Sequence, residues 1–239
     1  MSALKFGLPS KGRLQQDAID WFAKADVTVA RTGSDREYAG RVTGLDGIEL
    51  VLLSASEIPR ELAAGRIHLG VTGEDLIQEK LADWAAITPK VTHMGFGFAD
   101  LIIAVPTSWA DVTTLRDLDD AAAQFHANHG HRLRIATKYH NLVRGFLSQH
   151  GVADFEIVDS QGATEGTIKN QTAEAIADIT SSGATLTANH LRILTDGEIL
   201  KSQATLFAAR NAQWSQANRE TFATLCERLG LSPDLGPDL

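Results

Sequence analysis

The sequence contains a single cysteine, Cys226, so a disulfide within the chain and a cysteine-rich metal site are both excluded. It also lacks any apolar stretch of about 20 residues, the length that a membrane-spanning helix needs. Its first residues contain no long apolar region of the kind that forms a secretion signal. These absences favour an intracellular protein, and we expect it in the cytoplasm.

An excess of positive charge is missing too. The 22 lysines and arginines are outnumbered by 30 acids, which gives a net charge of -8. A general nucleic-acid binder needs the opposite sign, whereas a local basic pocket for phosphate groups is still compatible with this balance. The 239 residues, 44% of them hydrophobic, suit a globular protein of one large domain or two modest ones.

Short apolar runs alternate with helix-like segments along the chain. We expect strands at residues 4–8, 48–53, 68–71, 98–105, 133–136, 155–158 and 175–179. We expect helices at residues 11–25, 58–64, 115–129, 139–149 and 215–229. Glycines, Gly65 and Gly151, end the second and the fourth of these helices. The alternation predicts an α/β fold with mostly parallel sheets, in which ligands bind beyond the carboxyl ends of the strands.

Residues 178–189 are the most informative segment. Asp178 stands at the end of an expected strand, and small hydroxyl residues around Gly183 follow it. The backbone N–H groups and hydroxyls of such a turn can point at one phosphate. Asp178 is then placed to meet ribose hydroxyls or a magnesium ion on the same ligand. The alternative is a strand, a polar turn and a capped helix without a ligand.

Four further strands end in loops of similar chemistry, at residues 9–13, 72–75, 137–139 and 160–165. Each loop combines glycine or hydroxyl residues with a charge. Any one of them is explained as a solvated turn. The five loops together are explained less well in this way, because random turns need not combine cations suited to phosphate with acids suited to ribose.

Four ordered blocks resemble the ATP phosphoribosyltransferases of histidine biosynthesis. The blocks are residues 8–14, residues 54–59 with 65–76, residues 135–139 with Asn141 and Arg144, and residues 178–189 with Leu191. They extend over most of the first 195 residues, in the family's order. The resemblance implies two α/β lobes similar to type II periplasmic binding proteins, with the active site in the cleft between the lobes.

The resemblance also implies how the chain is divided. Lobe I would comprise residues 1–96 and 190–239, and lobe II would comprise residues 97–189 and carry the phosphoribosyl-pyrophosphate loop. The length of the chain resembles that of the short form of the family, which lacks the C-terminal regulatory domain. We therefore expect a homodimer within a hetero-oligomer, whose second subunit is a catalytically inert relative of histidyl-tRNA synthetase.

The implied reaction joins N1 of the ATP adenine to C1 of the ribose in phosphoribosyl pyrophosphate and expels pyrophosphate. It needs no covalent nucleophile from the protein, because the adenine nitrogen attacks directly. Catalysis would come from cations near the leaving pyrophosphate and from positioning of the two substrates. Mg²⁺, held largely by substrate oxygens, would neutralise part of the charge.

Two arginines, Arg13 and Arg36, are the expected catalytic residues, because a guanidinium matches phosphate oxygens at two points. Arg36 aligns more loosely, and a solvated loop arginine is the alternative for it. Lys11 is an expected phosphate contact. Glu74 and Asp75 are expected to hold a ribose hydroxyl or a magnesium-bound water, and their alternative is a pair of acids that only stabilises a helix start.

The other expected substrate-binding residues lie in the second half of the chain. Lys138 and Tyr139 would meet ATP, with a ring face or hydroxyl offered by Tyr139, and a core tyrosine beside a lysine is the alternative. Asp178 would bind the ribose hydroxyls, and Glu165 matches a family acid in the preceding loop. The expected phosphoribosyl-pyrophosphate loop contains Ser181, Ser182, Gly183, Ala184 and Thr185.

Three places depart from the family pattern. Ser181 stands where an acid is usual, residues 166–171 are polar where the family is apolar, and His190 replaces a common glycine. The histidine group at residues 126–131 forms no convincing metal set. Two other classes stay open: a two-lobed module that senses a small anion without chemistry, and a phosphoribosyltransferase that acts on another base.

Overall fold

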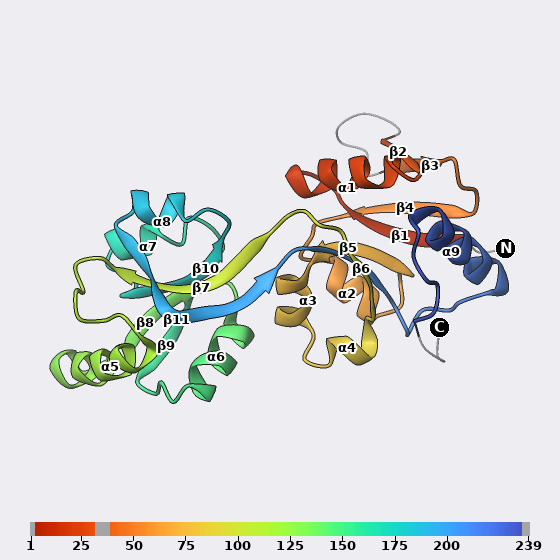
Figure 1. The fold of residues 1–239 in the computed structure, drawn as a ribbon. Coiled ribbons are helices and arrows are strands. Elements are labelled where there is room, and N and C mark those ends of the chain that lie inside the picture. The colour runs from red at the N-terminus through yellow and green to blue at the C-terminus, as the bar shows by residue number, and fades with distance from the viewer. Residues whose placement is uncertain (1–2, 32–38, 236–239) are drawn as a thin grey trace. The chain divides into compact units, whose positions relative to one another are not determined.

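The computed structural model describes residues 3–31 and 39–235 of an α/β protein. The chain divides into two compact units, residues 1–97 with 203–239 and residues 98–202 (Figure 1). It returns to the first unit at residues 202/203, whereas the resemblance placed this return at 189/190. The difference arises because β11 (Leu191–Ser202) pairs with β7 (Ala99–Pro106) in the sheet of the second unit.

A seven-stranded sheet forms the centre of the first unit, in the order β2-β3-β4-β1-β5-β12-β6. Its central strands β4 (Ile48–Leu53), β1 (Leu4–Pro9) and β5 (Leu69–Gly73) are parallel. The flanking strands are antiparallel to their neighbours: β2 (Thr28–Arg31), β3 (Ala39–Thr43), β12 (Ala204–Ala208) and β6 (Lys90–His93). The expected parallel pairing therefore forms the middle of a mixed sheet.

Helices cover both faces of this sheet. Leu50 and Leu52 of β4 share a core with α1 (Arg13–Ala23) and α9 (Gln216–Leu229). The intervening residues, Val51 and Leu53, pack instead against the core of α2 (Ile58–Ala63), α3 (Glu74–Lys80) and α4 (Trp84–Ile87). Because successive side chains of a strand point to opposite faces, β4 contributes to both cores.

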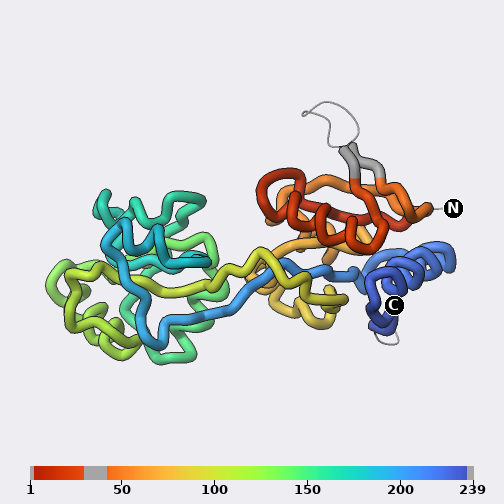
Figure 2. The backbone as a smooth tube through the Cα atoms, turned by 45° about the horizontal axis from the view of Figure 1, so that its top comes forward, coloured from red at the N-terminus to blue at the C-terminus, as the bar shows by residue number. Residues whose placement is uncertain are grey.

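The second unit contains a five-stranded sheet in the order β11-β7-β10-β8-β9. Here β10 (Ala175–Thr180), β8 (Leu133–Thr137) and β9 (Phe155–Asp159) are parallel, whereas β7 is antiparallel to β10 and β11. On one face lie α7 (Gly166–Lys169) and α8 (Ala184–Ala188), and on the other lie α5 (Leu115–His129) and α6 (His140–Gln149) (Figures 1 and 2).

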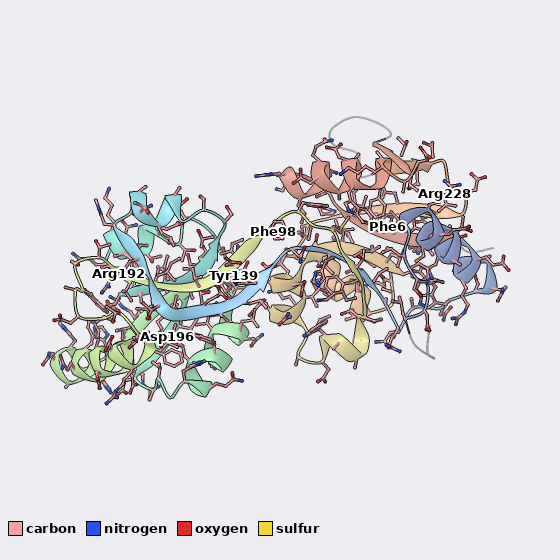
Figure 3. All side chains as sticks on the ribbon, in the orientation of Figure 1. Phe6, Phe98, Tyr139, Arg192, Asp196 and Arg228 are labelled. Atoms are coloured by element: carbon pink, nitrogen blue, oxygen red, sulfur yellow. The ribbon has the colours of Figure 1, made fainter. Side chains whose placement is uncertain are left out.

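Two side chains of β11, Arg192 and Asp196, hold the connection that follows β7 (Figure 3). The Arg192 guanidinium donates to three carbonyl oxygens of this connection, those of Trp109, Ala110 and Val112. The Asp196 carboxylate accepts from the Leu115 amide at 2.8 Å, at the first residue of α5. These bonds tie the connection to β11, and a capping box of Thr114 and Asp117 starts α5.

The predicted helices and strands are confirmed, with ends that shift by at most two residues, and both β4 and α5 have the predicted bounds. The sequence does not predict β2, β3, β6, β11 or β12. In β11 two irregularities of register interrupt the alternation of buried and exposed residues, so the strand lacks the period that identifies others. The four-residue β6 lies at the edge of its sheet and contains no fully buried side chain.

Gly65 follows α2 in the left-handed region, at φ +65°, and a Cβ on it would lie 2.3 Å from the Asn211 carbonyl oxygen. We expect Gly65→Ala to lower the free energy of unfolding by about 2–4 kcal/mol, because it adds a clash with main chain to the cost of this conformation. Gly230→Ala is the matched control: Gly230 ends α9 at φ +67° in open space, and we expect a loss of about 1 kcal/mol. If both variants lost the same free energy of unfolding in urea, the clash with the Asn211 carbonyl would be excluded as the cause.

A second stability prediction concerns the buried side chain of His68. Its Nδ1 accepts from the Lys5 amide at 2.9 Å, and its Nε2 lies 3.2 Å from the Gln213 carbonyl oxygen. Burial lowers the pKa of His68, so the folded state resists protonation. Below about pH 6.5 the unfolded chain binds a proton that the folded chain does not, and the free energy of unfolding should fall with decreasing pH.

We expect His68→Asn, whose side-chain oxygen can still accept from Lys5, to lose part of this pH dependence. The free energy of unfolding in urea is measured at pH 7.5 and at pH 5. His190→Asn, which changes an exposed histidine, is the control. The role of His68 is refuted if wild type and His68→Asn lose the same free energy between the two pH values.

Candidate active site

Three loops of the first unit lie together at the carboxyl ends of the parallel strands β4, β1 and β5. The Ser10 amide, after β1, donates to the Leu53 carbonyl at the end of β4, at 2.7 Å. The Thr72 hydroxyl of β5 donates to the Ala55 carbonyl at 2.9 Å. The first two sequence blocks, separated by about 40 residues, are thereby joined at one sheet edge.

The first of these loops carries the expected phosphate contacts Lys11 and Arg13, both exposed. The Arg13 Nε lies 3.4 Å from Asp17 one turn along α1, and the arginine side chain is 94% exposed. A cation at a helix start opposes the helix dipole, so Arg13 is not placed there to stabilise α1. The two cations create a positive surface suited to an anion beside the start of α1. The other expected catalytic residue, Arg36, lies outside the described residues.

The expected substrate acid Glu74 is buried at the start of α3 and is held by several partners. Its Oε2 lies 2.9 Å from Lys90 Nζ, and its Oε1 lies 2.8 Å from His93 Nδ1. The Thr205 hydroxyl donates to Oε1 at 3.3 Å. The neighbouring Asp75 is also buried. Two acids in the first turn match the helix-dipole alternative, and the contacts of Glu74 exceed what that alternative requires.

In the second unit the structure brings Lys138 and Asp178 together. Lys138 follows β8 and Asp178 lies near the end of β10, and these neighbouring strands are parallel. The Lys138 Nζ lies 3.8 Å from Asp178 Oδ1, which also accepts from the Ile179 amide at 2.8 Å. A cation suited to phosphate and an acid suited to ribose therefore share one sheet edge.

Tyr139 lies inside the second unit and is 1% exposed (Figure 3). The Lys138 Nζ stands 5.0 Å from the centre of its ring, within the range of a cation–π contact. The Tyr139 amide donates to the Thr137 hydroxyl at 2.9 Å. This placement matches the alternative of a core tyrosine beside a lysine, and the contact orients Lys138.

The expected phosphate loop follows Asp178 directly. Gly183 adopts the left-handed conformation at φ 71° and caps the short helix α8. Its amide donates to the Thr180 hydroxyl at 3.0 Å, and the Ala184 amide donates weakly to Ser182 Oγ at 3.4 Å. Ser181, Ser182, Ala184 and Thr185 are exposed. The loop thus has the turn that a phosphate cradle needs, and its own hydroxyls occupy two of the amides.

Glu165 lies beside the end of α8. It precedes α7 and lines a pocket with residues at the far end of α8, which are Ala188, Asn189 and His190. The left-handed backbone of Ala163 and the extended turn at Gly162 set the direction of this connection.

The sequence did not identify Lys90, His93, Thr205 or Thr180 as members of these clusters. Only a Lys-x-x-His spacing in an unpredicted strand and a hydroxyl beside the glycine turn point to them. Among residues 3–31 and 39–235, no three histidine, cysteine or acidic side chains gather in a way that would hold a metal ion. Single carboxylates near expected phosphate contacts still fit Mg²⁺, which keeps most of its ligands from water and phosphate oxygens.

In the described part of the chain, no helix is both long enough and apolar enough to span a bilayer.

Solved structures share this fold. An ATP phosphoribosyl transferase (HisG:HisZ) complex from Thermotoga maritima superposes with a TM-score of 0.72 at 22% identity, over 95% of this chain and 96% of that one. The arginine-bound form of a truncated ArgBP from T. maritima gives 0.51 at 11% identity, over 96% and 95% of the two chains. At these identities the likeness establishes the fold alone, which is the expected α/β architecture related to periplasmic binding proteins.

The sequence comparisons are more specific. An ATP phosphoribosyltransferase of Cereibacter sphaeroides is 66% identical over 228 residues, which cover 95% of this chain and 96% of that protein. An ATP phosphoribosyltransferase of Nitrobacter winogradskyi is 51% identical, over 95% of this chain and 70% of its own length. The family described as ATP phosphoribosyltransferase matches residues 54–230. The chain therefore belongs to the ATP phosphoribosyltransferase family.

Proposed function

We propose that this protein transfers the phosphoribosyl group of phosphoribosyl pyrophosphate to N1 of ATP and releases pyrophosphate, the first step of histidine biosynthesis. The observation that carries the proposal is the 66% identity, over nearly the whole chain, to an ATP phosphoribosyltransferase. The three charged loops of the first unit and the Lys138–Asp178 edge of the second supply the chemistry that this reaction needs.

In the reaction a bond forms between adenine N1 and ribose C1 while the bond from C1 to the pyrophosphate oxygen breaks. The pyrophosphate leaves with the bonding electron pair, and positive charge grows on the ribose. The protein lowers this barrier by stabilising the charge that develops on the leaving group and by holding the two substrates in line.

We assign the stabilisation of the departing pyrophosphate to Lys11 and Arg13, which lie at the start of α1 in the first unit, together with Arg36. Guanidinium groups bind two phosphate oxygens at once and keep their charge at every physiological pH. Asp75 and Glu74 supply the negative charge of the same edge, where a ribose hydroxyl or a magnesium-bound water would be held.

In the second unit the Asp178 carboxylate accepts hydrogen bonds from the ribose hydroxyls. The loop from Ser181 to Thr185 binds the 5′-phosphate. Lys138 stands beside Asp178 and, with Tyr139 beneath it, faces the ATP. Glu165, which lines the pocket beside the end of α8, is a further substrate-binding residue of this proposal.

Members of the family use a metal ion, and we propose Mg²⁺ for this chain. Bound to the substrate phosphates, it would neutralise part of the pyrophosphate charge. Asp75 of the first unit, or Asp178 of the second, would hold a magnesium-bound water. We also propose a cytoplasmic protein and a homodimer that associates with a regulatory subunit similar to histidyl-tRNA synthetase, since the T. maritima structure with this fold is a HisG:HisZ complex.

The direct test is turnover of the purified chain with ATP, phosphoribosyl pyrophosphate and Mg²⁺, alone and with the candidate regulatory subunit. We expect phosphoribosyl-ATP and pyrophosphate in equal amounts. Absence of phosphoribosyl-ATP in both assays would overturn the proposal. Product from another base, with none from ATP, would point to a different phosphoribosyltransferase.

Arg13→Ala tests the assignment of the leaving group. We expect kcat to fall at least a hundredfold and the Kd for ATP to change less than threefold, because the lost interaction strengthens only as the pyrophosphate departs. Arg219→Ala, which removes an exposed helix arginine of the same unit, should leave both values unchanged. Equal losses of kcat and ATP affinity in Arg13→Ala would contradict the leaving-group role.

Asp178→Asn tests the ribose contact in the second unit. The change keeps the shape of the side chain and removes its charge, so we expect kcat/KM for phosphoribosyl pyrophosphate to fall at least tenfold. Asp159→Asn is the matched control: Asp159 ends the neighbouring parallel strand β9 and pairs with His140 at 3.0 Å. If both variants lose kcat/KM equally, general electrostatics and not ribose binding explains the effect.

A further inference from the structure

A compact charged cluster in the first unit joins Glu74, Lys90, His93 and Thr205. Glu74 begins α3, Lys90 and His93 begin and end β6, and Thr205 lies on β12 between β6 and β5. The Lys90 Nζ lies 2.9 Å from Glu74 Oε2 and 3.1 Å from His93 Nε2. The His93 Nδ1 lies 2.8 Å from Glu74 Oε1, which closes a ring of three contacts.

The chemistry of lysine determines the protons in this ring. A lysine ammonium only donates, so His93 Nε2 must accept from Lys90. The proton of a neutral His93 then sits on Nδ1 and is donated to Glu74 Oε1. The carboxylate thus holds the histidine in one tautomer, and both groups hold the lysine.

A β-bulge makes this convergence possible. On β12, Leu206 pairs with Thr92 but Phe207 pairs with Lys90, so Val91 is an extra residue on β6. Residues three apart on a regular strand point to opposite faces, and one extra residue reverses the alternation between them. Lys90 therefore shares a face with His93 and Thr205, and its Nζ also stands 5.8 Å from the centre of the Trp84 ring.

The exposed side of the cluster is cationic. The side chains of His93 and Lys90 are 45% and 29% exposed, whereas that of Glu74 is 9% exposed. Oε1 of Glu74 lies 2.8 Å from His93 Nδ1, and the Thr205 hydroxyl lies 3.3 Å from it and 3.3 Å from the Gln203 carbonyl oxygen. Lys90 uses two of its three N–H donors for Glu74 and His93. A ligand that approaches therefore meets a lysine N–H before it meets the carboxylate.

The cluster lies at the same sheet edge as the loops described above. Thr205 of β12 pairs with His93 of β6 on one side and with Thr72 of β5 on the other. The Thr72 hydroxyl is the one that binds the second loop. We propose that Lys90 contacts phosphate oxygens of the pyrophosphate group, and that Glu74 and His93 are positioning residues that hold its ammonium. The inference rests on the proposed function. It replaces the direct ribose or water contact proposed there for Glu74 by a role through Lys90.

Calorimetric titration of the full chain with inorganic pyrophosphate tests this assignment. We expect Lys90→Met to weaken pyrophosphate binding at least tenfold, because one charge-assisted hydrogen bond is lost. Lys90→Arg keeps the charge and should bind within about threefold of wild type. Lys80→Met, which removes an exposed lysine at the end of α3 in the same unit, is the matched control and should bind like wild type.

Lys90→Met alone leaves the Glu74 carboxylate buried without its ion-pair partner and can destabilise the fold. The double variant Glu74→Gln/Lys90→Met removes that charge as well and should fold while still binding pyrophosphate at least tenfold more weakly. Wild-type affinity in the folded double variant would overturn the proposal. Equal weakening in Lys80→Met would overturn it too, because net charge alone would then explain the loss.

The proposed function and this inference fail separately. If wild type forms no phosphoribosyl-ATP but its pyrophosphate affinity depends on Lys90, the transferase assignment fails and the phosphate contact stands. If wild type turns over and Lys90→Met leaves the KM for phosphoribosyl pyrophosphate and inhibition by pyrophosphate unchanged, the phosphate contact fails alone.

Discussion

The parallel pairing of neighbouring strands determines where the charged groups of this protein lie. Parallel strands end at one edge of a sheet, so the loops that follow them are brought together even when they are distant in sequence. In the first unit β4, β1 and β5 gather three loops in this way. In the second unit the pairing of β8 with β10 places Lys138 beside Asp178, 40 residues away in the chain. If either pairing slipped, these contacts would be lost while most helices stayed intact.

The sequence predicts this part of the structure well, because parallel α/β units have a strong hydrophobic period and glycine stop signals. It predicts α5 and β4 with their observed bounds, and it names both partners of the Lys138–Asp178 pair. The prediction from sequence fails where a side chain's direction depends on a shift of one residue in the pairing of two strands. The bulge at Val91 turns Lys90 toward Glu74, and no pattern in Lys-Val-Thr-His indicates a bulge. The burial of Tyr139 depends on tertiary packing in the same way.

Both units pair cations with acids in the same way. A chain with a net charge of -8 must still attract highly charged phosphates. The cations of the proposed site are each balanced by a nearby acid: Arg13 by Asp17, Lys90 by Glu74, and Lys138 by Asp178. Such a pairing orients the cation, and the remaining N–H donors stay available for an anion.

In the glycine turn, the Gly183 amide donates its hydrogen bond to a hydroxyl of the same turn, that of Thr180. A ligand that takes this amide must displace a hydroxyl that is already a good acceptor. A neutral acceptor gains almost nothing by the exchange, whereas a doubly charged phosphate gains a stronger, charge-assisted bond. The displaced hydroxyl then has its own proton to donate. If the turn binds the 5′-phosphate as proposed, it therefore discriminates by charge before it discriminates by shape.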